Sequence, residues 1–271
     1  QKYILFYMNI LDYIIKRAKS SPKRIIFTEY FDDRIKNAIK LIEKNKVAIP
    51  IIIEKGSLEQ KLKKSEELIL NKKADAIITG ATYPTKETVL FAIKHKKGFI
   101  SSSWLILNKN KTYLFADCAV NPIPDSNKLA EIALQTSSTM KLLGIKPKVA
   151  FLSYSTKGSA SNEQIGIIKK AVQIFKKNNN ITADGELQLD AAIVPEVAKI
   201  KNSKIIKGDA NVLIFPDLNS ANIGIKLIER FGNVESIGPI FQNTEFPIND
   251  LSRGCNAKQI YHLAAFTSIQ K

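Results

Sequence analysis

The chain has 271 residues, of which 45% are hydrophobic, and its formal net charge at neutral pH is +16. No run of about 18 apolar residues occurs, which argues against a membrane span. The positive charge is spread over nearly every predicted helix, without a basic tail or interleaved aromatic residues, so we expect no nucleic-acid partner. The 2 cysteines and 2 histidines show no metal-binding spacing, so no metal is expected either.

The N-terminal residues 1–7 precede Met8 and are interpreted as upstream or added sequence. Their apolar run is short and no small-residue cleavage site follows it, which argues against a signal peptide. We therefore expect the first domain to begin at residue 8.

Short β-branched runs alternate with amphipathic stretches along the chain. In chain order, the pattern predicts a helix at 9–20, a strand at 24–28, a helix at 33–43, a strand at 48–53, a helix at 57–71, a strand at 75–79, a helix at 86–95, strands at 99–107 and 112–116, a helix at 126–143, a strand at 148–153, helices at 162–177 and 190–199, a strand at 211–215, and helices at 219–231 and 256–270. Several strands are continuously apolar, as strands buried on both faces are. This alternation predicts an α/β fold with a largely parallel sheet.

Ligands in such sheets bind beyond the carboxyl ends of the strands, so the loops there are searched first. In the loop 154–161, Ser155, Thr156 and Lys157 could cradle a phosphate together with backbone N–H groups. The Walker A spacing is absent, and a merely polar loop is the alternative. After the strand at 211–215, Asp217 or Asn219 could cap the next helix or reach a ligand.

Two further segments are predicted to be irregular. Residues 184–190 are predicted to form a polar loop, and Pro195 is predicted to kink the helix that follows. Residues 238–240, with the sequence Gly-Pro-Ile, are predicted to form a tight connection.

The most informative segment is NDLSRGC at 249–255. It places the hydroxyl of Ser252 and the guanidinium of Arg253 before a glycine at a predicted helix entry. A guanidinium and the N–H groups of a helix N-terminus both suit an anion, although an ordinary turn is the alternative. A Cys255–His262 nucleophile pair is a further alternative, but a small buried thiol and a surface imidazole are favoured.

Taken together, several segments resemble the phosphate acetyltransferase family, whose members move an acetyl group between coenzyme A and phosphate. The matching segments are LSYSTKGSAS at 152–161, DGELQLDAAIVPEVA at 184–198, GDANVLIFPDLNSANIGIKL at 208–227, IGPI at 237–240 and PINDLSRGC at 247–255. The first half matches more loosely, through TEYFDDR at 28–34, ADAIITGATYPTKET at 74–88 and LFADCAVNPIP at 114–124.

The resemblance implies an isocitrate/isopropylmalate dehydrogenase-like fold, in which two α/β domains flank a cleft. We expect a first domain formed by residues 8–98 plus 242–271, and a second domain formed by 99–241. The resemblance also implies a homodimer that acts on acetyl-CoA and phosphate, with coenzyme A as a substrate and no other cofactor, and we expect a cytoplasmic protein. In the family, a base helps to form the CoA thiolate, which attacks the carbonyl of acetyl phosphate, and phosphate leaves.

The resemblance also assigns roles to residues. Ser252 and Arg253 fall on the catalytic motif: Ser252 would donate to the oxyanion or a phosphoryl oxygen, and Arg253 would clamp the phosphoryl group. Arg34 would bind a phosphate of CoA. The predicted phosphate- and CoA-binding set is completed by Ser155, Thr156, Lys157 and Asn219.

The chain departs from the family pattern at three places. Gln259 occupies the position of the carboxylate base, and an amide cannot accept a proton at neutral pH. Leu90 occupies the position of an arginine that binds phosphate. Only residues 56–73 stand where the family has a much longer segment with a further basic box. Removal of one charged group that stabilises a transition state typically costs ~2–4 kcal/mol, so these replacements bear on turnover.

The sequence is compatible with three functions. The intact SRGC, STKGS and FPDLN segments favour a phosphate acetyltransferase with a simplified site. Gln259 and Leu90 favour a degenerate relative that binds acyl-CoA or phosphate without efficient turnover. A NAD-dependent dehydrogenase on the same broad fold is the weakest, because the chain has no GxGxxG fingerprint.

Overall fold

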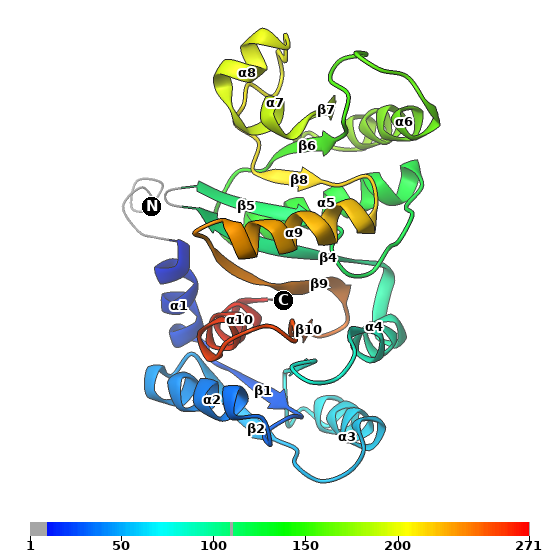
Figure 1. Ribbon diagram of the computed structural model, residues 1–271. Coiled ribbons are helices and arrows are strands. Elements are labelled where there is room, and N and C mark those ends of the chain that lie inside the picture. The colour runs from blue at the N-terminus through cyan, green and yellow to red at the C-terminus, as the bar shows by residue number, and fades with distance from the viewer. Residues whose placement is uncertain (1–9, 109–110, 271) are drawn as a thin grey trace. The chain divides into compact units, whose positions relative to one another are not determined.

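The structure is a computed structural model that describes residues 10–108 and 111–270 (Figure 1). The interpretation of residues 1–7 lies outside these residues. Residue contacts divide the described residues into two compact units: unit 1 comprises those up to Ile100 and from Ile237 onward, and unit 2 comprises those between Ser101 and Ser236. The predicted domains, 8–98 plus 242–271 and 99–241, stay a prediction.

Unit 1 is built on parallel strands that lie in the order β2 (Ala48–Ile52), β1 (Lys23–Phe27), β3 (Ala76–Thr79) and β10 (Ile248–Asp250). β10 also pairs in the antiparallel direction with β9 (Glu235–Thr244). The helices of this unit are α1 (Ile10–Ser20), α2 (Asp33–Asn45), α3 (Leu58–Leu70), α4 (Thr85–Lys94) and α10 (Ala257–Ile269).

The C-terminal helix α10 lies inside unit 1 rather than on its surface. Every residue from 260 to 269 is buried, and the helix packs against α1, α2 and β1 (Figure 1). A helix that is apolar all round requires such cover, whereas α2 has one apolar stripe and one charged face. The position of α10 fixes the segment that precedes it, which contains Ser252 and Arg253.

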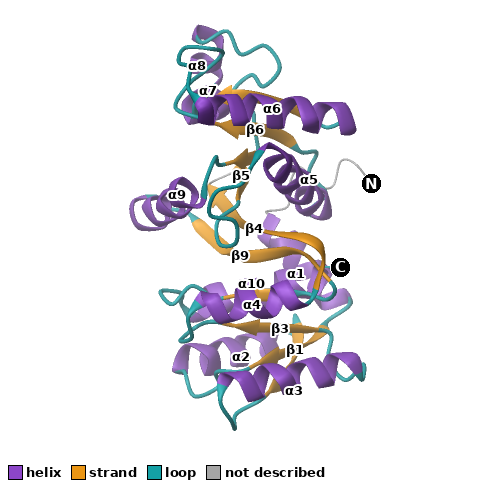
Figure 2. Cartoon of the chain, turned by 90° about the vertical axis from the view of Figure 1, so that its right-hand side faces the viewer, coloured by secondary structure: helices purple, strands orange, loops and turns teal. Residues whose placement is uncertain are grey.

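Unit 2 has its strands in the order β4 (Lys96–Asn108), β5 (Lys111–Ala116), β8 (Val212–Ile214), β6 (Lys148–Leu152) and β7 (Thr182–Leu187). β4 and β5 are antiparallel, and the remaining pairs are parallel. The helices are α5 (Ser126–Leu142), α6 (Glu163–Asn178), α7 (Leu189–Ile193), α8 (Pro195–Ile200) and α9 (Leu218–Phe231). Figure 2 shows α5 and α9 on opposite faces of these strands.

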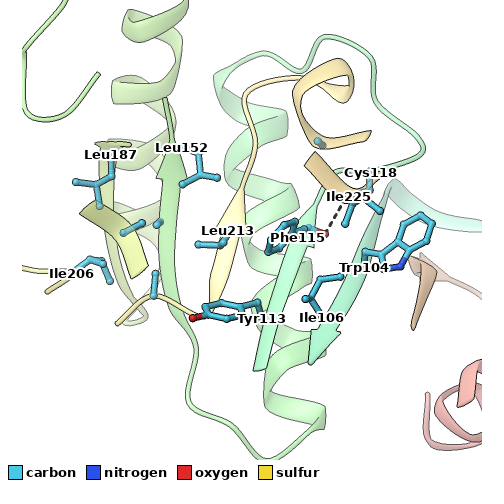
Figure 3. Close-up of a cluster of buried hydrophobic side chains, with 14 residues drawn as sticks. Trp104, Ile106, Tyr113, Phe115, Cys118, Leu152, Leu187, Ile206, Leu213 and Ile225 are labelled. Atoms are coloured by element: carbon cyan, nitrogen blue, oxygen red, sulfur yellow. Dashed lines mark hydrogen bonds between the residues drawn. The ribbon is translucent and has the colours of Figure 1, made fainter. Parts of the chain in front are cut away.

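The apolar runs that predicted buried strands form a core cluster in unit 2 (Figure 3). Leu213 of β8, Phe115 of β5 and Ile225 of α9 belong to it, together with Trp104 and Cys118. The Cys118 thiol is fully enclosed and donates to the carbonyl of Phe115 at 3.2 Å. Cys118 is therefore a core residue and belongs to no polar site.

The predicted α/β class is confirmed, and every predicted strand and helix is present. The predicted helix at 190–199 is broken before Pro195 into α7 and α8, because proline favours the first turn of a helix. Two predictions were wrong: β7 occupies residues 184–187 of the supposed loop at 184–190, and β9 runs through the supposed connection at 238–240. The short strand β10 was missed. Among the described residues, none of the helices combines the length and the apolar character needed to cross a bilayer.

Candidate active site

The candidate catalytic residues lie where three neighbouring parallel strands end. β1, β3 and β10 run in the same direction, so their following loops, 28–32, 80–84 and 251–256, meet at one edge of unit 1. The backbone N–H of Leu251 donates to Thr79 O at 2.8 Å, which keeps the last loop beside β3. The edge at which sequence reasoning searched for a ligand site is therefore the edge that holds Ser252 and Arg253.

The SRGC segment, residues 252–255, forms a turn before α10. The N–H of Cys255 donates to Ser252 O at 2.8 Å, and Asn256 then caps the helix. Ser252 is half-buried, and Arg253 is exposed. The guanidinium of Arg253 has no hydrogen-bond or ion-pair partner within residues 10–108 and 111–270, so its donors can bind an anion.

Arg34, at the start of α2, is brought together with the SRGC segment. Its Nη1 donates to Arg253 O at 2.6 Å and to Cys255 O at 3.1 Å, and its Nη2 donates to Ala81 O at 2.8 Å. Nε and Nη2 also bind the carboxylate of Asp32, the N-cap residue of α2. Hydrogen bonding to Arg34 holds the pKa of Asp32 below its usual range, and the same bond raises the pKa of Arg34. Arg34 therefore forms hydrogen bonds with all three loops, 28–32, 80–84 and 251–256.

Glu29, which follows β1, orders the loop after β3. The residue is 1% exposed, and its carboxylate accepts from the backbone N–H groups of Ala81, Thr82 and Tyr83 at 3.0, 2.7 and 3.2 Å. The hydroxyl of Thr82 adds a fourth bond at 2.7 Å. Several such donors offset the cost of burying a carboxylate, so Glu29 holds this loop in one conformation.

Asp250, the last residue of β10, is a second buried carboxylate at this edge. Thr85 and Thr88 donate to it at 2.8 and 2.7 Å. Burial raises the pKa of Asp250 to about 7, against the opposing effect of these hydroxyls. Gly80 packs against the carboxylate, because a Cβ there would lie 2.0 Å from Oδ1. The raised pKa means that Asp250 carries a proton over part of the neutral pH range.

The two positions that depart from the family pattern also belong to unit 1. Gln259 forms a capping box with Asn256: its N–H donates to Asn256 Oδ1 at 2.9 Å, and its Oε1 accepts from Asn256 N at 3.0 Å. Leu90 lies on α4 and is half-exposed. The amide of Gln259 thus has a structural role at the start of α10, and neither side chain supplies a charge.

The predicted phosphate loop of unit 2 is folded around two carboxylates of its own chain. The hydroxyl of Ser155 and the N–H of Gly158 donate to Glu186 Oε1 at 3.2 and 2.6 Å, and the ammonium of Lys157 is paired with Asp184. Thr156 Oγ1 accepts from the N–H of Gln188 at 2.9 Å. Ser155 and Thr156 are buried, whereas the side chain of Lys157 is about one-third exposed.

Either Asp217 or Asn219 was expected to cap α9, and the structure shows which of them does. Asp217 is the N-cap and accepts from Ser220 N at 2.8 Å. Asn219 lies in the first turn, is exposed, and its amide has no partner in the described part of the chain. Asn219 is therefore not the cap, and its contact with a ligand stays a prediction.

The structure argues against a nucleophile pair formed by Cys255 and His262. α10 begins at Ala257, so Cys255 lies outside the helix and the two residues do not share a helix face. His262 is 3% exposed, which also corrects the expected surface imidazole. Burial raises the pKa of the Cys255 thiol to about 11, with the Arg34 charge acting in the opposite direction, so the thiol is protonated at neutral pH.

Sequence reasoning missed the buried carboxylates that shape both loop clusters. They are Glu29, Asp250, Asp184 and Glu186. The available signal was their position: each lies within a strand or within two residues of its end, where an unpaired charge would be costly and must therefore be compensated. Among the described residues, no group of three or more His, Cys, Asp and Glu side chains is arranged to hold a metal ion.

Comparison with known proteins gives one consistent family. The model of the family described as "Phosphate acetyl/butaryl transferase" matches residues 57–268. The phosphate acetyltransferase of Bacillus subtilis (strain 168) is 38% identical over 312 residues, which cover 94% of this chain and 97% of the relative. The aligned length includes gaps and exceeds the 271 residues of the chain, so the relative has residues without a counterpart here.

Solved structures give the same result. The crystal structure of a phosphotransacetylase from Streptococcus pyogenes matches with a TM-score of 0.84 and 33% identity, covering 96% of this chain and 97% of that chain. A Salmonella typhimurium protein proposed to be a 4-hydroxythreonine-4-phosphate dehydrogenase matches with a TM-score of 0.55 and 10% identity, covering 90% and 99%. This second likeness concerns the fold alone, and it confirms the predicted dehydrogenase-like fold class.

Proposed function

The chain belongs to the phosphate acetyl/butaryl transferase family, and on this basis we propose that it is a phosphate acetyltransferase, which transfers an acetyl group reversibly between coenzyme A and phosphate. The observation that supports this most directly is the SRGC segment, in which the exposed residue Arg253 directly follows Ser252 in the chain. In the direction from acetyl phosphate, the thiolate sulfur attacks the carbonyl carbon, a C–S bond forms, and the C–O bond to phosphate breaks.

Arg253 and Ser252 have separate roles in this proposal. Arg253 binds the phosphoryl oxygens, because a guanidinium forms charge-assisted bonds with phosphate. Ser252 donates to the carbonyl oxygen, on which negative charge develops in the transition state. Donors of this kind typically contribute about 2.7–4 kcal/mol each to the lowering of the barrier.

The thiol proton is not removed by Gln259 in this proposal. The Gln259 amide is held in the capping box of α10, and an amide does not accept a proton. A thiol is a few per cent thiolate near neutral pH, and we propose that the protein uses this fraction of coenzyme A. The rate is then expected to rise with pH until the thiol of coenzyme A is ionised.

The loop of unit 2 is a second proposed anion-binding element, considered by itself. The ammonium of Lys157 has three N–H groups and is paired with Asp184, so further donors remain for a phosphate. The exposed amide of Asn219 adds a second polar contact, and Ser155 and Thr156 shape the loop that presents Lys157. The net charge of +16 favours the approach of anionic coenzyme A by steering.

We also propose a cytoplasmic homodimer that needs no redox cofactor or metal, since direct acyl transfer involves no oxidation or reduction and uses only positioned charges. A surface for the second subunit is available on α9. Ile223, Leu227 and Phe231 follow one another at helical spacing and are 59%, 52% and 86% exposed. Contiguous exposed apolar side chains of this kind commonly mark a protein–protein interface.

A degenerate relative that binds acyl-CoA or phosphate without efficient turnover is the second candidate. It is favoured by Gln259 and Leu90, which supply no charge where the family uses a carboxylate and an arginine. The exposed guanidinium of Arg253 favours the enzyme, because it has no structural partner in the described residues.

The deciding experiment measures acetyl-CoA formation from acetyl phosphate and coenzyme A with the purified protein, and CoA binding by calorimetry on the same sample. Turnover with saturation in both substrates is expected. Binding of CoA without turnover would favour the degenerate relative. The absence of both would contradict the proposal altogether.

A further inference from the structure

The structure assigns Arg34 a positioning role that differs from a direct contact with a CoA phosphate. We propose that its guanidinium holds the backbone of the SRGC segment in the conformation that presents Arg253 and the Gly254 N–H to an anion. This inference rests on the proposed function, because the anion is the phosphoryl group of that reaction.

The first argument is that the donors of Arg34 are fully used. A guanidinium has five N–H groups. Nη1 donates to Arg253 O and Cys255 O, Nη2 donates to Ala81 O and Asp32, and Nε donates to Asp32. No N–H group of Arg34 is left for a phosphate unless one of these acceptors is given up.

The second argument is that Arg34 is itself held in place. Asp32 accepts from the backbone N of Arg34 at 2.8 Å, from Nε at 3.0 Å and from Nη2 at 2.7 Å. The side chains of Arg34 and Asp32 are 32% and 13% exposed, so the pair is shielded from water over most of its surface. A guanidinium fixed by a bidentate carboxylate can define the positions of the carbonyls to which it donates.

The third argument concerns the direction of the peptide groups in the SRGC segment. In a trans peptide, the C=O of one residue and the N–H of the next point in opposite directions. Because Arg253 O faces Arg34, the N–H of Gly254 faces away from it, and this N–H has no partner among the described residues. Arg34 therefore sets the orientation of one anion donor, and it anchors the backbone that carries another.

The two cysteines of the chain allow a test that needs no turnover. Cys255 accepts a bond from Arg34 through its carbonyl, and the residue is 8% exposed, whereas Cys118 is enclosed in unit 2. Alkylation by iodoacetamide, read by mass spectrometry for each cysteine, would be compared in wild type, Arg34→Gln and Arg34→Lys. Lys36→Gln is the matched control, since it removes one charge from the same helix at an exposed pair with Asp33.

The two interpretations predict opposite signs at Cys255. If Arg34 holds the segment, Arg34→Gln releases it, and a return of the thiol pKa from about 11 to its ordinary 9.0 raises the alkylation rate up to about 100-fold at a pH below both values. If Arg34 does not hold it, the variant only removes a nearby positive charge. The thiol pKa then rises further and alkylation slows, or the rate does not change.

Faster alkylation of Cys255 in Arg34→Gln, with Lys36→Gln like wild type and Cys118 protected in every variant, would support the proposal. Slower or unchanged alkylation of Cys255 would overturn it. If Arg34→Gln fails to fold, Cys118 becomes reactive as well. The direction of the change in alkylation rate at Cys255 in Arg34→Lys then distinguishes the two interpretations. One ammonium cannot bind Asp32 and three carbonyls together, so Arg34→Lys is also expected to raise the rate at Cys255.

A kinetic comparison adds the functional readout. With coenzyme A and with dephospho-CoA, Arg34→Lys is expected to lower kcat by the same factor, while the ratio of the two KM values stays as in wild type. Loss of the preference for coenzyme A over dephospho-CoA would show a direct phosphate contact and overturn the proposal. If the wild-type protein gives no turnover, the proposed function fails, and the alkylation experiment alone decides the role of Arg34.

Discussion

Asp250→Asn is expected to flatten the pH dependence of protein stability. In the unfolded chain this carboxyl ionises at its ordinary pKa of 3.8, whereas burial raises the pKa to about 7 in the folded protein. Folding therefore takes up a proton between these pH values, so stability falls as the pH rises through this window. From pH 5 to pH 7 the free energy of unfolding decreases by about 2 kcal/mol through this group.

An asparagine at this position has the same shape and cannot ionise. The hydroxyls of Thr85 and Thr88, at 2.8 and 2.7 Å from the carboxylate, can each donate to or accept from an amide, so the hydrogen bonds are kept. The free energy of unfolding of the variant, relative to that of wild type, is therefore expected to be about 2 kcal/mol higher at pH 7 than at pH 5.

The measurement is urea unfolding of wild type and variant at several pH values from 5 to 8, followed by far-UV circular dichroism. Trp104, the single tryptophan, belongs to the core cluster of unit 2, and its fluorescence gives a second probe of unfolding. A difference in stability between the two proteins that stays constant across this range would refute the argument from burial.

Three further outcomes are expected. Arg253→Ala should lower kcat/KM for acetyl phosphate by roughly a hundred- to thousandfold with unchanged circular dichroism, and a wild-type rate would rule out its role. Gln259→Asp should raise kcat at pH 7 and extend activity to lower pH if the missing base limits the rate; an unchanged pH profile would show that another step limits it. Gly80→Ala should destabilise the protein in thermal unfolding, because its Cβ would lie 2.0 Å from Asp250 Oδ1 and φ is +95°; a variant as stable as wild type would contradict this packing.

The elements that sequence reasoning found are those whose pattern is local. The apolar run of β8 and the amphipathic stripes of α2 and α9 are visible within about a dozen residues. The strand β7 was missed because Asp184 and Glu186 resemble loop residues, and their burial is compensated by Lys157 and Gly158, which are 27 and 28 positions away. The Gly-Pro pair within β9 was misleading for a similar reason, since its pairing partner β10 is a separate short segment.

In the candidate site, too, local features could be predicted from the sequence and features that depend on distant residues could not. The motif of Ser252 and Arg253 could be recognised from the sequence because it is contiguous. The use of Arg34 could not, because the carbonyls that it binds lie 219 and 221 positions away and belong to the backbone, which leaves no trace in residue identity. The pKa of Asp250 likewise depends on burial and on Glu29, and neither can be read from the sequence around it.

The way in which unit 1 is assembled has a consequence for synthesis on the ribosome. Its strand β10 pairs with β3, and its helix α10 packs on β1, but both are made only after the whole of unit 2. Unit 2 is a continuous stretch and can fold as soon as it emerges. The first hundred residues, in contrast, must wait with the edge of β3 uncovered, and an open strand edge invites association with other chains. Nascent chains that stall before residue 248 are therefore the form of this protein that depends most on chaperones.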